Sequence, residues 1–534
     1  MCTLSLQAAA LSPTAIITIP MLLLFFGLMI GVGFACRKHA TNVDGFVLGG
    51  RNVGPWLTAF AFGTSYFSAV IFVGYAGQFG WDFGLASTWI GLGNAFIGSL
   101  LAWAVLGRRT RVMTQHLGSK TMPDFFEKRY DSKKLKTIAS VIVFLFLIPY
   151  TASLYNGLSS LFNNVFAIPY WVVVLVMAVL TGVYVIFGGY MATAINDFIQ
   201  GVIMLVGIIT VVAAVLTQNG GFTAATETLS AKEGAPFTSL VGPSPVALLM
   251  VVLLTSLGTW GLPQMVGKFY SIKDEGSIKK GTIISTVFAI VVAGGCYFLG
   301  GFGRLYSDKV PRTEEGKVLF DKIIPVMLQD LAPVVVALII VLVLAASMST
   351  LSSLVLTSSS TLTLDVIKPM AEKKGAFSEK KSVLIMRGFI VFFVAISAAI
   401  AILKDSVWAD TMFIGQMMGV SWGALAGAFL APFLYGLYWK KTTRTAVAVS
   451  FAFGVGLELL QLCIGMGWLS VKGVPVLEFV FTNSLYSGVF AMMGGLVLVP
   501  LVSLFTKGTR PTDVEEKFAC YKKQVVTNQK TSLG

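Results

Sequence analysis

The chain alternates between long apolar runs and short polar connections. Thirteen runs are long enough to cross the hydrocarbon core of a bilayer, which takes about 20 residues in a helix. Their approximate bounds are 13–35, 55–80, 83–107, 137–165, 170–188, 192–217, 244–266, 282–306, 332–366, 383–403, 411–438, 445–466 and 480–506. Because lipid offers no partners to backbone polar groups, such runs predict helices. The pattern therefore predicts an all-α polytopic membrane protein of about 13 transmembrane helices.

Composition agrees with this class and excludes others. Of 534 residues, 56% are hydrophobic and only 12% are charged, and the mean hydropathy is +0.82. No soluble domain of this length has such a composition. The sequence contains no phosphate-binding GxxxxGK[ST] motif and no evident catalytic or metal-ligating cluster, so we expect neither an ATP-driven pump nor an enzyme.

Basic residues gather on one side of the predicted membrane. Most of the 39 lysines and arginines fall in connections that share a side, at 37–51, 108–136, 268–280, 368–387 and 440–444, and in the tail. Because basic loops stay in the cytoplasm, the amino terminus is predicted outside and the carboxyl terminus inside a plasma (inner) membrane. The net charge of +14 then reflects topology and contact with anionic lipid, with no need for a nucleic-acid partner.

Two predicted helices are interrupted at corresponding places. Glycine and hydroxyl-bearing residues interrupt the apolar residues at 62–69 (FGTSYFSA) and at 254–263 (LTSLGTWGLP). In the second segment Pro263 also lacks a backbone N–H donor. Unwound backbone at membrane depth is tolerated where it lines a cavity enclosed by protein. The breaks are five spans apart, which predicts two inverted five-helix repeats, spans 2–6 and 7–11. Ordinary glycine kinks in packed helices are the alternative.

The ninth span carries five hydroxyl side chains at its centre, within 344–353 (LAASMSTLSS). Residues three and four apart share a helix face, so several of these hydroxyls lie on neighbouring turns. Hydroxyl and carbonyl oxygens coordinate small hard cations. The same residues would also let two helices pack closely, and this stretch alone does not decide between the two.

Asp197 is the charged residue that the sixth span carries near its inner start, and no basic residue shares that span. A carboxylate at membrane depth costs several kcal/mol unless it is paired. We expect it to face a cation, with a helix cap as the alternative.

These segments resemble the sodium/solute symporters. The likeness rests on GGR at 49–51, on GG at 188–189 with NDFIQG at 196–201, and on MSTLS at 348–352 followed by LDV at 364–366. The resemblance implies a LeuT-like 5+5 inverted-repeat core with extra helices at each end. Accordingly, the expected parts are an N-terminal extra helix (1–45), the transport core (46–445), C-terminal extra helices (446–506) and a cytoplasmic tail (507–534).

The resemblance also implies sodium ligands. The common sodium site of the family falls on the carbonyls of Thr64, Phe67 and Ala346 and the hydroxyls of Ser349 and Thr350. A second site, used by some members, would take Asp197, Ser352 and Ser353. Sodium is the only metal expected.

Residues for the solute are less well marked, because the polar or aromatic residues of proline-type and galactose-type members are mostly missing here. Polar and aromatic residues near the breaks and in span four are the candidates for lining a cavity: Ser65, Tyr66, Ser68, Gln78, Tyr150, Ser153, Thr255, Ser256, Thr259 and Trp260. Mid-span aromatic residues are equally typical of core packing.

We therefore expect a sodium-coupled symporter, able to act as a monomer, that imports a small organic solute by alternating access. The solute class includes carboxylates such as amino acids, monocarboxylates, pantothenate and sialic acids. The alternative is an ion channel or a sodium-gated sensor on the same scaffold.

Overall fold

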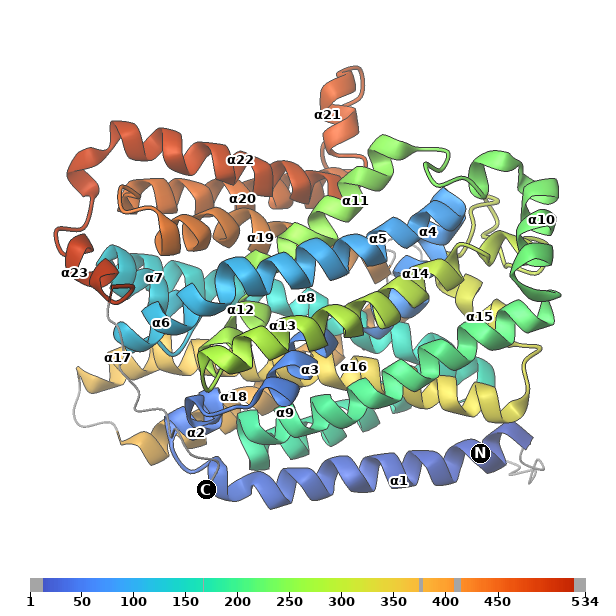
Figure 1. Ribbon diagram of the computed structural model, residues 1–534, viewed down its shortest axis with the longest axis horizontal. Helices are drawn as coiled ribbons and strands as arrows, with labels where there is room; N and C mark the ends of the chain where they lie inside the picture. The colour runs from blue at the N-terminus through green and yellow to red at the C-terminus, as the bar shows by residue number, and fades with distance from the viewer. Residues whose placement is uncertain (1–12, 167, 374–377, 408–413, 523–534) are drawn as a thin grey trace, which may run out of the picture.

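A computed structural model describes residues 13–166, 168–373, 378–407 and 414–522 of the chain. These residues form helices of α, 3-10 and π type, and the described part contains no β-strand. The long helices run side by side along the longest dimension of the molecule (Figure 1). The all-α class predicted from the hydrophobic runs is confirmed.

Each of the thirteen apolar runs coincides with a helix or with consecutive helical segments. In the first half these are α1 (Pro13–Ala35), α3 (Pro55–Tyr66) with η3 (Val70–Tyr75) and α4 (Ala76–Phe83), α5 (Thr88–Gly93) with η5 (Asn94–Leu101) and η6 (Trp103–Gly107), α8 (Lys133–Phe166) and α9 (Tyr170–Gln218). In the second half they are α11 (Pro245–Leu257) with η8 (Gly258–Gly261) and α12 (Pro263–Tyr270), α13 (Glu275–Ala289) with η9 (Ile290–Gly294) and α14 (Gly295–Gly300), α16 (Pro333–Thr361) with η12 (Leu362–Ile367), α18 (Glu379–Val407), α19 (Ile414–Tyr438), α20 (Arg444–Gly465) and α22 (Ser484–Phe505).

Continuous helix in the described residues gives ten membrane-length helices, or eleven with the bent pair around Leu262. Two of these runs are nearly 50 residues long, Val70–His116 and Tyr170–Gln218, more than twice the length that a span needs. Both runs leave the helical conformation at a glycine, Gly84 in the first and Gly189 in the second, where φ is +61° and +54°. Only glycine adopts this conformation readily. Each run is long enough for two spans, and dividing both runs at these glycines gives thirteen spans over the described residues.

Short helices mark the two ends of the bundle. At one end lie α2 (Val43–Leu48), α6 (Arg108–His116), α7 (Met122–Tyr130), α17 (Lys368–Glu372) and α23 (Val514–Ala519), and at the other lie α10 (Gly221–Glu233) and α15 (Ile323–Leu328) (Figure 1). The first end carries the connections that are rich in lysine and arginine.

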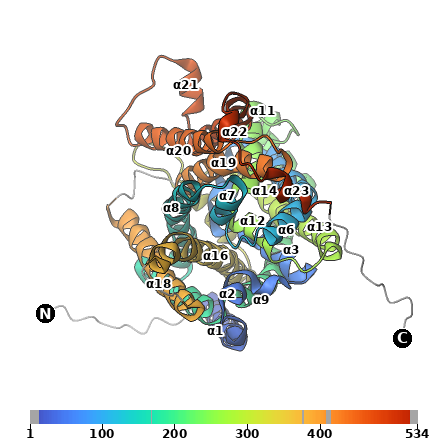
Figure 2. The same ribbon diagram turned by 90° about the vertical axis from the view of Figure 1, so that its left-hand side faces the viewer.

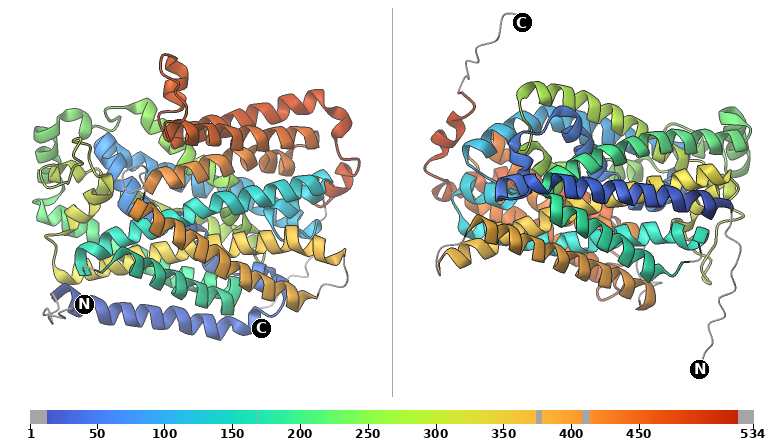
Figure 3. Two further views of the ribbon diagram at one scale, coloured as in Figure 1. Left: turned by 180° about the vertical axis from the view of Figure 1, so that it is seen from behind. Right: turned by 90° about the horizontal axis from the view of Figure 1, so that it is seen from below.

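The extra helices flank a central core. Seen along the bundle, α20 and α22 lie on one side and α1 on the opposite side (Figure 2). Figure 3 shows α1 lying along the outside of the bundle, where it contacts α9 and α16. Helix α16 is central, and nearly every residue from Ala337 to Thr361 is buried. The segment with the hydroxyl cluster thus lies where solvent and lipid are both excluded.

Both predicted breaks are present, and they have the same geometry. Helix α3 ends at Tyr66, Phe67 is extended (φ −91°, ψ 117°), and helix resumes by Val70. In the seventh span Leu262 is extended (φ −84°, ψ 120°), and Pro263 starts α12 at a bend of 47°. Proline suits the first turn of a helix because its missing donor is not needed there. Each break interrupts the helical hydrogen bonding and leaves backbone oxygens available to other partners.

Glycines bring α4 and α14 into close contact. A β-carbon at Gly80 would overlap the backbone of Gly300, and one at Gly300 would overlap the carbonyl of Ala76. The facing atoms belong to the backbone and cannot rotate away.

Replacing Gly80 with alanine should therefore destabilise the protein. We expect a loss of about 2 kcal/mol or more, because the two helices must separate, measured as a lower melting temperature in detergent. Gly31→Ala in α1 is the matched control, since a β-carbon there meets nothing within 4 Å, and it should be neutral or slightly stabilising. Equal melting temperatures for the two variants would contradict the close helix contact.

Candidate functional site

Five oxygen atoms converge where the break after α3 meets α16. The Ser349 hydroxyl lies 3.3 Å from the Thr64 carbonyl oxygen and 3.1 Å from that of Ala346. The Thr350 hydroxyl lies 3.3 Å from the carbonyl oxygens of Thr64 and Phe67 and 3.2 Å from that of Ala346. All five residues are buried. These are the five residues that the resemblance assigned to the common sodium site.

The break explains why these carbonyls are available. Thr64 lies in the last turn of α3, and Phe67 lies just beyond it. The last carbonyls of a helix have no backbone donor four residues on. The two hydroxyls of α16, Ser349 and Thr350, donate to them.

The spacing of the oxygens fits a small cation. Oxygen ligands about 2.4 Å from a hard cation and about 90° apart around it lie about 3.4 Å from one another. The hydroxyl-to-carbonyl distances here are 3.1 to 3.3 Å. Two hydroxyls and three carbonyls carry no net charge, which suits a monovalent ion better than a divalent one.

A second polar cluster surrounds Asp197. Its Oδ2 lies 3.5 Å from Nζ of Lys268, and the ammonium donates a hydrogen bond of 2.9 Å to Oγ of Ser353. Ser352 instead donates to the carbonyl of Ser349 in its own helix, at 2.9 Å. Of the three residues considered for a second sodium, Asp197 and Ser353 thus meet around a lysine.

The structure corrects the predicted position of Lys268, which the basic-residue pattern placed in an inner connection between spans. It lies in α12 and is buried. The apolar run ends by composition at 266, but the structure continues the helix past it to Tyr270. The sequence contains one indication of this helix. Gln264 and Lys268 are four residues apart, so they share one face of a helix that continues past the apolar run. Asp197 in turn lies about two turns past Gly189 inside α9, so it caps no helix start.

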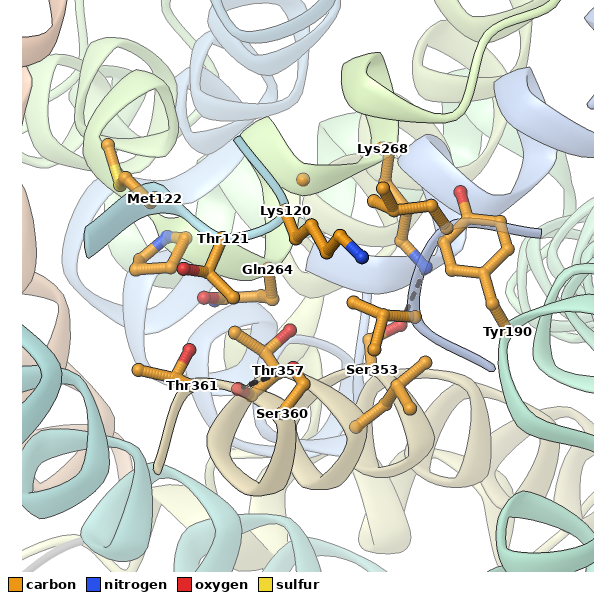
Figure 4. A pocket seen from close by; sticks show the side chains of 15 residues that line it. Lys120, Thr121, Met122, Tyr190, Gln264, Lys268, Ser353, Thr357, Ser360 and Thr361 are labelled. Carbon is orange, nitrogen blue, oxygen red and sulfur yellow. Dashed lines mark hydrogen bonds between the residues drawn. The ribbon is translucent and has the colours of Figure 1, made fainter. Parts of the chain in front are cut away.

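A cavity adjoins this cluster, and residues of α2 and of the start of α7 are part of its lining. Figure 4 shows the side chains that line it, Lys268 and Ser353 among them. Hydroxyl, amide and ammonium groups line much of it: Lys120, Thr121, Gln264, Lys268, Ser353, Thr357, Ser360 and Thr361. Lys120 forms its own ion pair with Asp44, at 2.9 Å. The cavity gives Lys268 a polar approach from the end of the bundle where the basic connections gather.

Charged groups close the same end of the bundle. Nζ of Lys136 lies 2.9 Å from carboxylate oxygens of Asp124 and Glu127 and 3.5 Å from Oδ1 of Asp365. Thr121 donates to Oδ2 of Asp365 at 2.6 Å. These contacts join α7, α8 and η12, so they form a latch at the predicted cytoplasmic end.

The residues predicted to contact the solute differ in whether their polar groups already have hydrogen-bond partners in the protein. Ser68 and Tyr150 are buried, and Trp422 of α19 packs at right angles to the Tyr150 ring with 6.0 Å between centroids. Among the described residues, no hydrogen bond of ordinary geometry joins the Ser68 hydroxyl, the Tyr150 hydroxyl or the Trp422 indole to a partner. The Tyr150 hydroxyl is nevertheless close enough to Ser68 and Trp422 to interact with both side chains, so the three polar groups form one buried cluster. Trp422 was missed because one indole in an apolar span is typical of packing.

Six other candidates already have partners in the protein. Ser65 bonds to the Ala61 carbonyl at 2.5 Å and to Ser353 at 2.9 Å, and Ser153 bonds to the Tyr150 carbonyl at 2.7 Å.

In the seventh span, hydrogen bonds join Thr255 to the Val251 carbonyl and Thr259 to the Ser256 carbonyl, both at 2.8 Å, and join Ser256 to Asn94 at 3.1 Å and Trp260 to the Ile97 carbonyl at 3.0 Å. Gln78 is half-buried in α4. The side chain of Tyr66 lies outside the described part of the chain.

Comparison with known proteins identifies the family to which this chain belongs. The model of the sodium:solute symporter family matches residues 46–454. The chain belongs to that family. Membership makes it a multi-pass membrane transporter that couples sodium to a small organic solute.

Individual relatives agree with this assignment. The chain is 29% identical over 494 residues to sodium/proline symporters of Staphylococcus aureus, among them those of strains JH9 and COL, covering 91% of this chain and 92% of each relative. A solved Na+-coupled sialic acid symporter, substrate-bound and outward-open, superimposes with a TM-score of 0.72 at 16% identity, covering 92% of this chain and 97% of that one. At this identity the superposition shows the fold, which is LeuT-like.

The latch gives a prediction for Asp124, which lies outside the spans. Burial alone would raise the pKa of Asp124, but Lys136 and Lys128 outweigh it and hold the pKa below its usual range. A lowered pKa means that the carboxylate stabilises the fold at any pH above about 4, the ordinary value, and loses this effect as pH falls through the folded-state pKa.

Asp124→Asn should therefore lower the free energy of unfolding by about 2 kcal/mol, uniformly from pH 8 to pH 5 and by less below pH 4. Melting temperatures across that range measure the effect. Asp44→Asn, which breaks the more exposed pair with Lys120, should cost well under 1 kcal/mol. Similar losses in the two variants would show that the latch is no stronger than a surface pair.

Proposed function

We propose that the chain imports a small, carboxylate-bearing organic solute with sodium held by Thr64, Phe67, Ala346, Ser349 and Thr350. The observation that carries the proposal is the convergence of these five buried oxygens from two separate elements. A cation there bridges the broken helix and α16. Family membership adds independent support for sodium as the coupling ion.

The bridge provides a coupling mechanism. An ion shifts a conformational equilibrium only by its difference in affinity for the two states. Sodium needs oxygens from both sides of the interface, so it favours the state in which the break after α3 and α16 are close. Solute contacts that need the same arrangement then bind more tightly, and each ligand raises the affinity of the other by the same factor.

For the solute we propose Ser68, Tyr150 and Trp422 as contacts. Their hydroxyl and indole groups offer donors in a buried region beside the break. Donors of this kind can hold a carboxylate without a neighbouring cation. The names of the relatives, a sodium/proline and a sialic acid symporter, agree with an acidic or zwitterionic solute.

We further propose the topology and parts that the sequence predicts. The amino terminus lies outside, and the basic end with α2, α6, α7 and α17 faces the cytoplasm of a plasma (inner) membrane. The core comprises residues 46–445, and the helices on either side of it are accessory. The transporter acts as a monomer.

The solute is tested by a stability screen. Amino acids, monocarboxylates, pantothenate, sialic acids and sugars are added to the purified protein with and without sodium. A ligand of the native state raises the melting temperature in proportion to RT ln(1 + [L]/Kd). We expect a carboxylate to give a shift that needs sodium. A shift with a neutral sugar alone would reject the proposed class.

The sodium ligands are tested without knowing the solute. Replacing both Ser349 and Thr350 with alanine should raise at least tenfold the sodium concentration needed for half of the thermal stabilisation, about 1.4 kcal/mol or more. Ser347→Ala is the control, because within the described residues that hydroxyl bonds to the Val343 carbonyl of its own helix, at 2.9 Å. Unaltered sodium dependence in the double variant would reject the assignment.

The coupling ion should be sodium, with lithium as a substitute and protons ineffective, because the proposed ligands are hydroxyl and carbonyl oxygens with no titrating histidine. Proteoliposomes loaded with the solute found in the screen measure this. Uptake driven by a pH gradient in sodium-free buffer would contradict it. A channel or a sensor would give no accumulation of solute above its outside concentration.

A further inference from the structure

Lys268 is the buried cation of the cluster around Asp197, and it joins three elements of the core. Its ammonium reaches Asp197 of α9 at 3.5 Å and Ser353 of α16 at 2.9 Å, while the lysine itself belongs to α12. Asp197 is 0% exposed, Lys268 4% and Ser353 3%. Such complete burial is rare for a lysine unless it is paired.

The surroundings of the ammonium are those of a small monovalent cation. A carboxylate oxygen and a hydroxyl oxygen contact it, and the face of the Tyr190 ring lies 5.4 Å away. That ring is fixed by a hydrogen bond of 2.5 Å between its hydroxyl and Ser271. An ammonium carries one positive charge and has only donors, so it satisfies the same oxygens that a sodium ion would coordinate.

Charge balance excludes a second cation beside it. Asp197 is the carboxylate in contact with the ammonium, and its other oxygen, Oδ1, has no hydrogen-bond partner among the described residues. The nearby Lys120 is paired with Asp44 and does not compete. A sodium ion added here would place two cations against one carboxylate in a buried site, where like charges repel strongly.

We propose that Lys268 is a tethered cation that occupies the place of a second sodium ion, so the transporter binds a single sodium. The proposal rests on the function proposed above. It also implies a latent site: without the ammonium, Asp197 and Ser353 remain as a buried carboxylate and hydroxyl that a sodium ion can enter through the adjoining cavity.

Equilibrium binding of radioactive sodium to the purified full-length protein, without any solute, tests this directly. The wild-type chain should bind one sodium ion. Lys268→Gln, which removes the charge and keeps a polar side chain, should bind two. Lys268→Gln combined with Asp197→Asn should return to one, and Lys268→Arg, which keeps the charge, should also bind one.

The two sites are separated by combining variants. Alanine at both Ser349 and Thr350 should abolish sodium binding in the wild-type background at concentrations that saturate wild type. In the Lys268→Gln background the same double substitution should still allow one sodium ion to bind, at Asp197 and Ser353. If Lys268→Gln does not fold, the number of sodium ions bound by Asp197→Asn tests the proposal instead. The tethered cation predicts one bound sodium ion in wild type and one in this variant.

The outcomes distinguish this inference from the function that it rests on. Two sodium ions on the wild-type chain, a single ion on folded Lys268→Gln, or a lower count in Asp197→Asn would each overturn the tethered cation while leaving sodium coupling intact. A wild-type chain that binds no sodium would instead overturn the proposed function. In that case a sodium ion gained by Lys268→Gln would still support the latent site.

Discussion

The structure depends on a broken helix whose backbone oxygens need partners where no water is available. Hydrocarbon cannot supply those partners, and an unsatisfied carbonyl at that depth costs several kcal/mol. Helix α16 supplies them with two hydroxyls, because Ser349 and Thr350 face the carbonyls of Thr64 and Phe67. These hydrogen bonds are neutral and of modest strength. Under the proposed function a cation replaces them, and the break then serves as its binding site.

Charge adds a second constraint at the neighbouring cluster. A carboxylate as buried as Asp197 requires a cation, and a mobile ion and a fixed lysine meet the requirement in different ways. A mobile ion leaves when the site opens, whereas Lys268 stays attached to α12. Hydrogen bonds from Lys268 to Ser353 and from Ser353 to Ser65 connect this cluster to α3, next to Thr64. The fixed charge and the proposed sodium ligands thus belong to one continuous polar interface between the broken helices and α16.

The sequence predicted the features that follow from local chemistry. Apolar run lengths gave the spans, glycine and hydroxyl residues gave the two breaks, and the family motifs gave the five residues that converge at α16. Features that depend on tertiary contacts were missed. Lys268 reads as a loop residue because a lysine ends an apolar run, and only its contact with Asp197 of another helix explains its burial. Trp422 looks like packing until its position against Tyr150 is known.

The number of sodium ions determines which solutes the membrane potential can help to concentrate. One charge moved across 100 mV provides about 2.3 kcal/mol, equal to about a 50-fold gradient. A zwitterionic amino acid carried with one sodium ion moves one net charge and gains this amount. A carboxylate anion carried with one sodium ion moves none and gains only from the sodium concentration gradient. A transporter whose second cation is fixed in the protein is therefore better matched to a zwitterion, which favours amino acids over simple monocarboxylates within the proposed class.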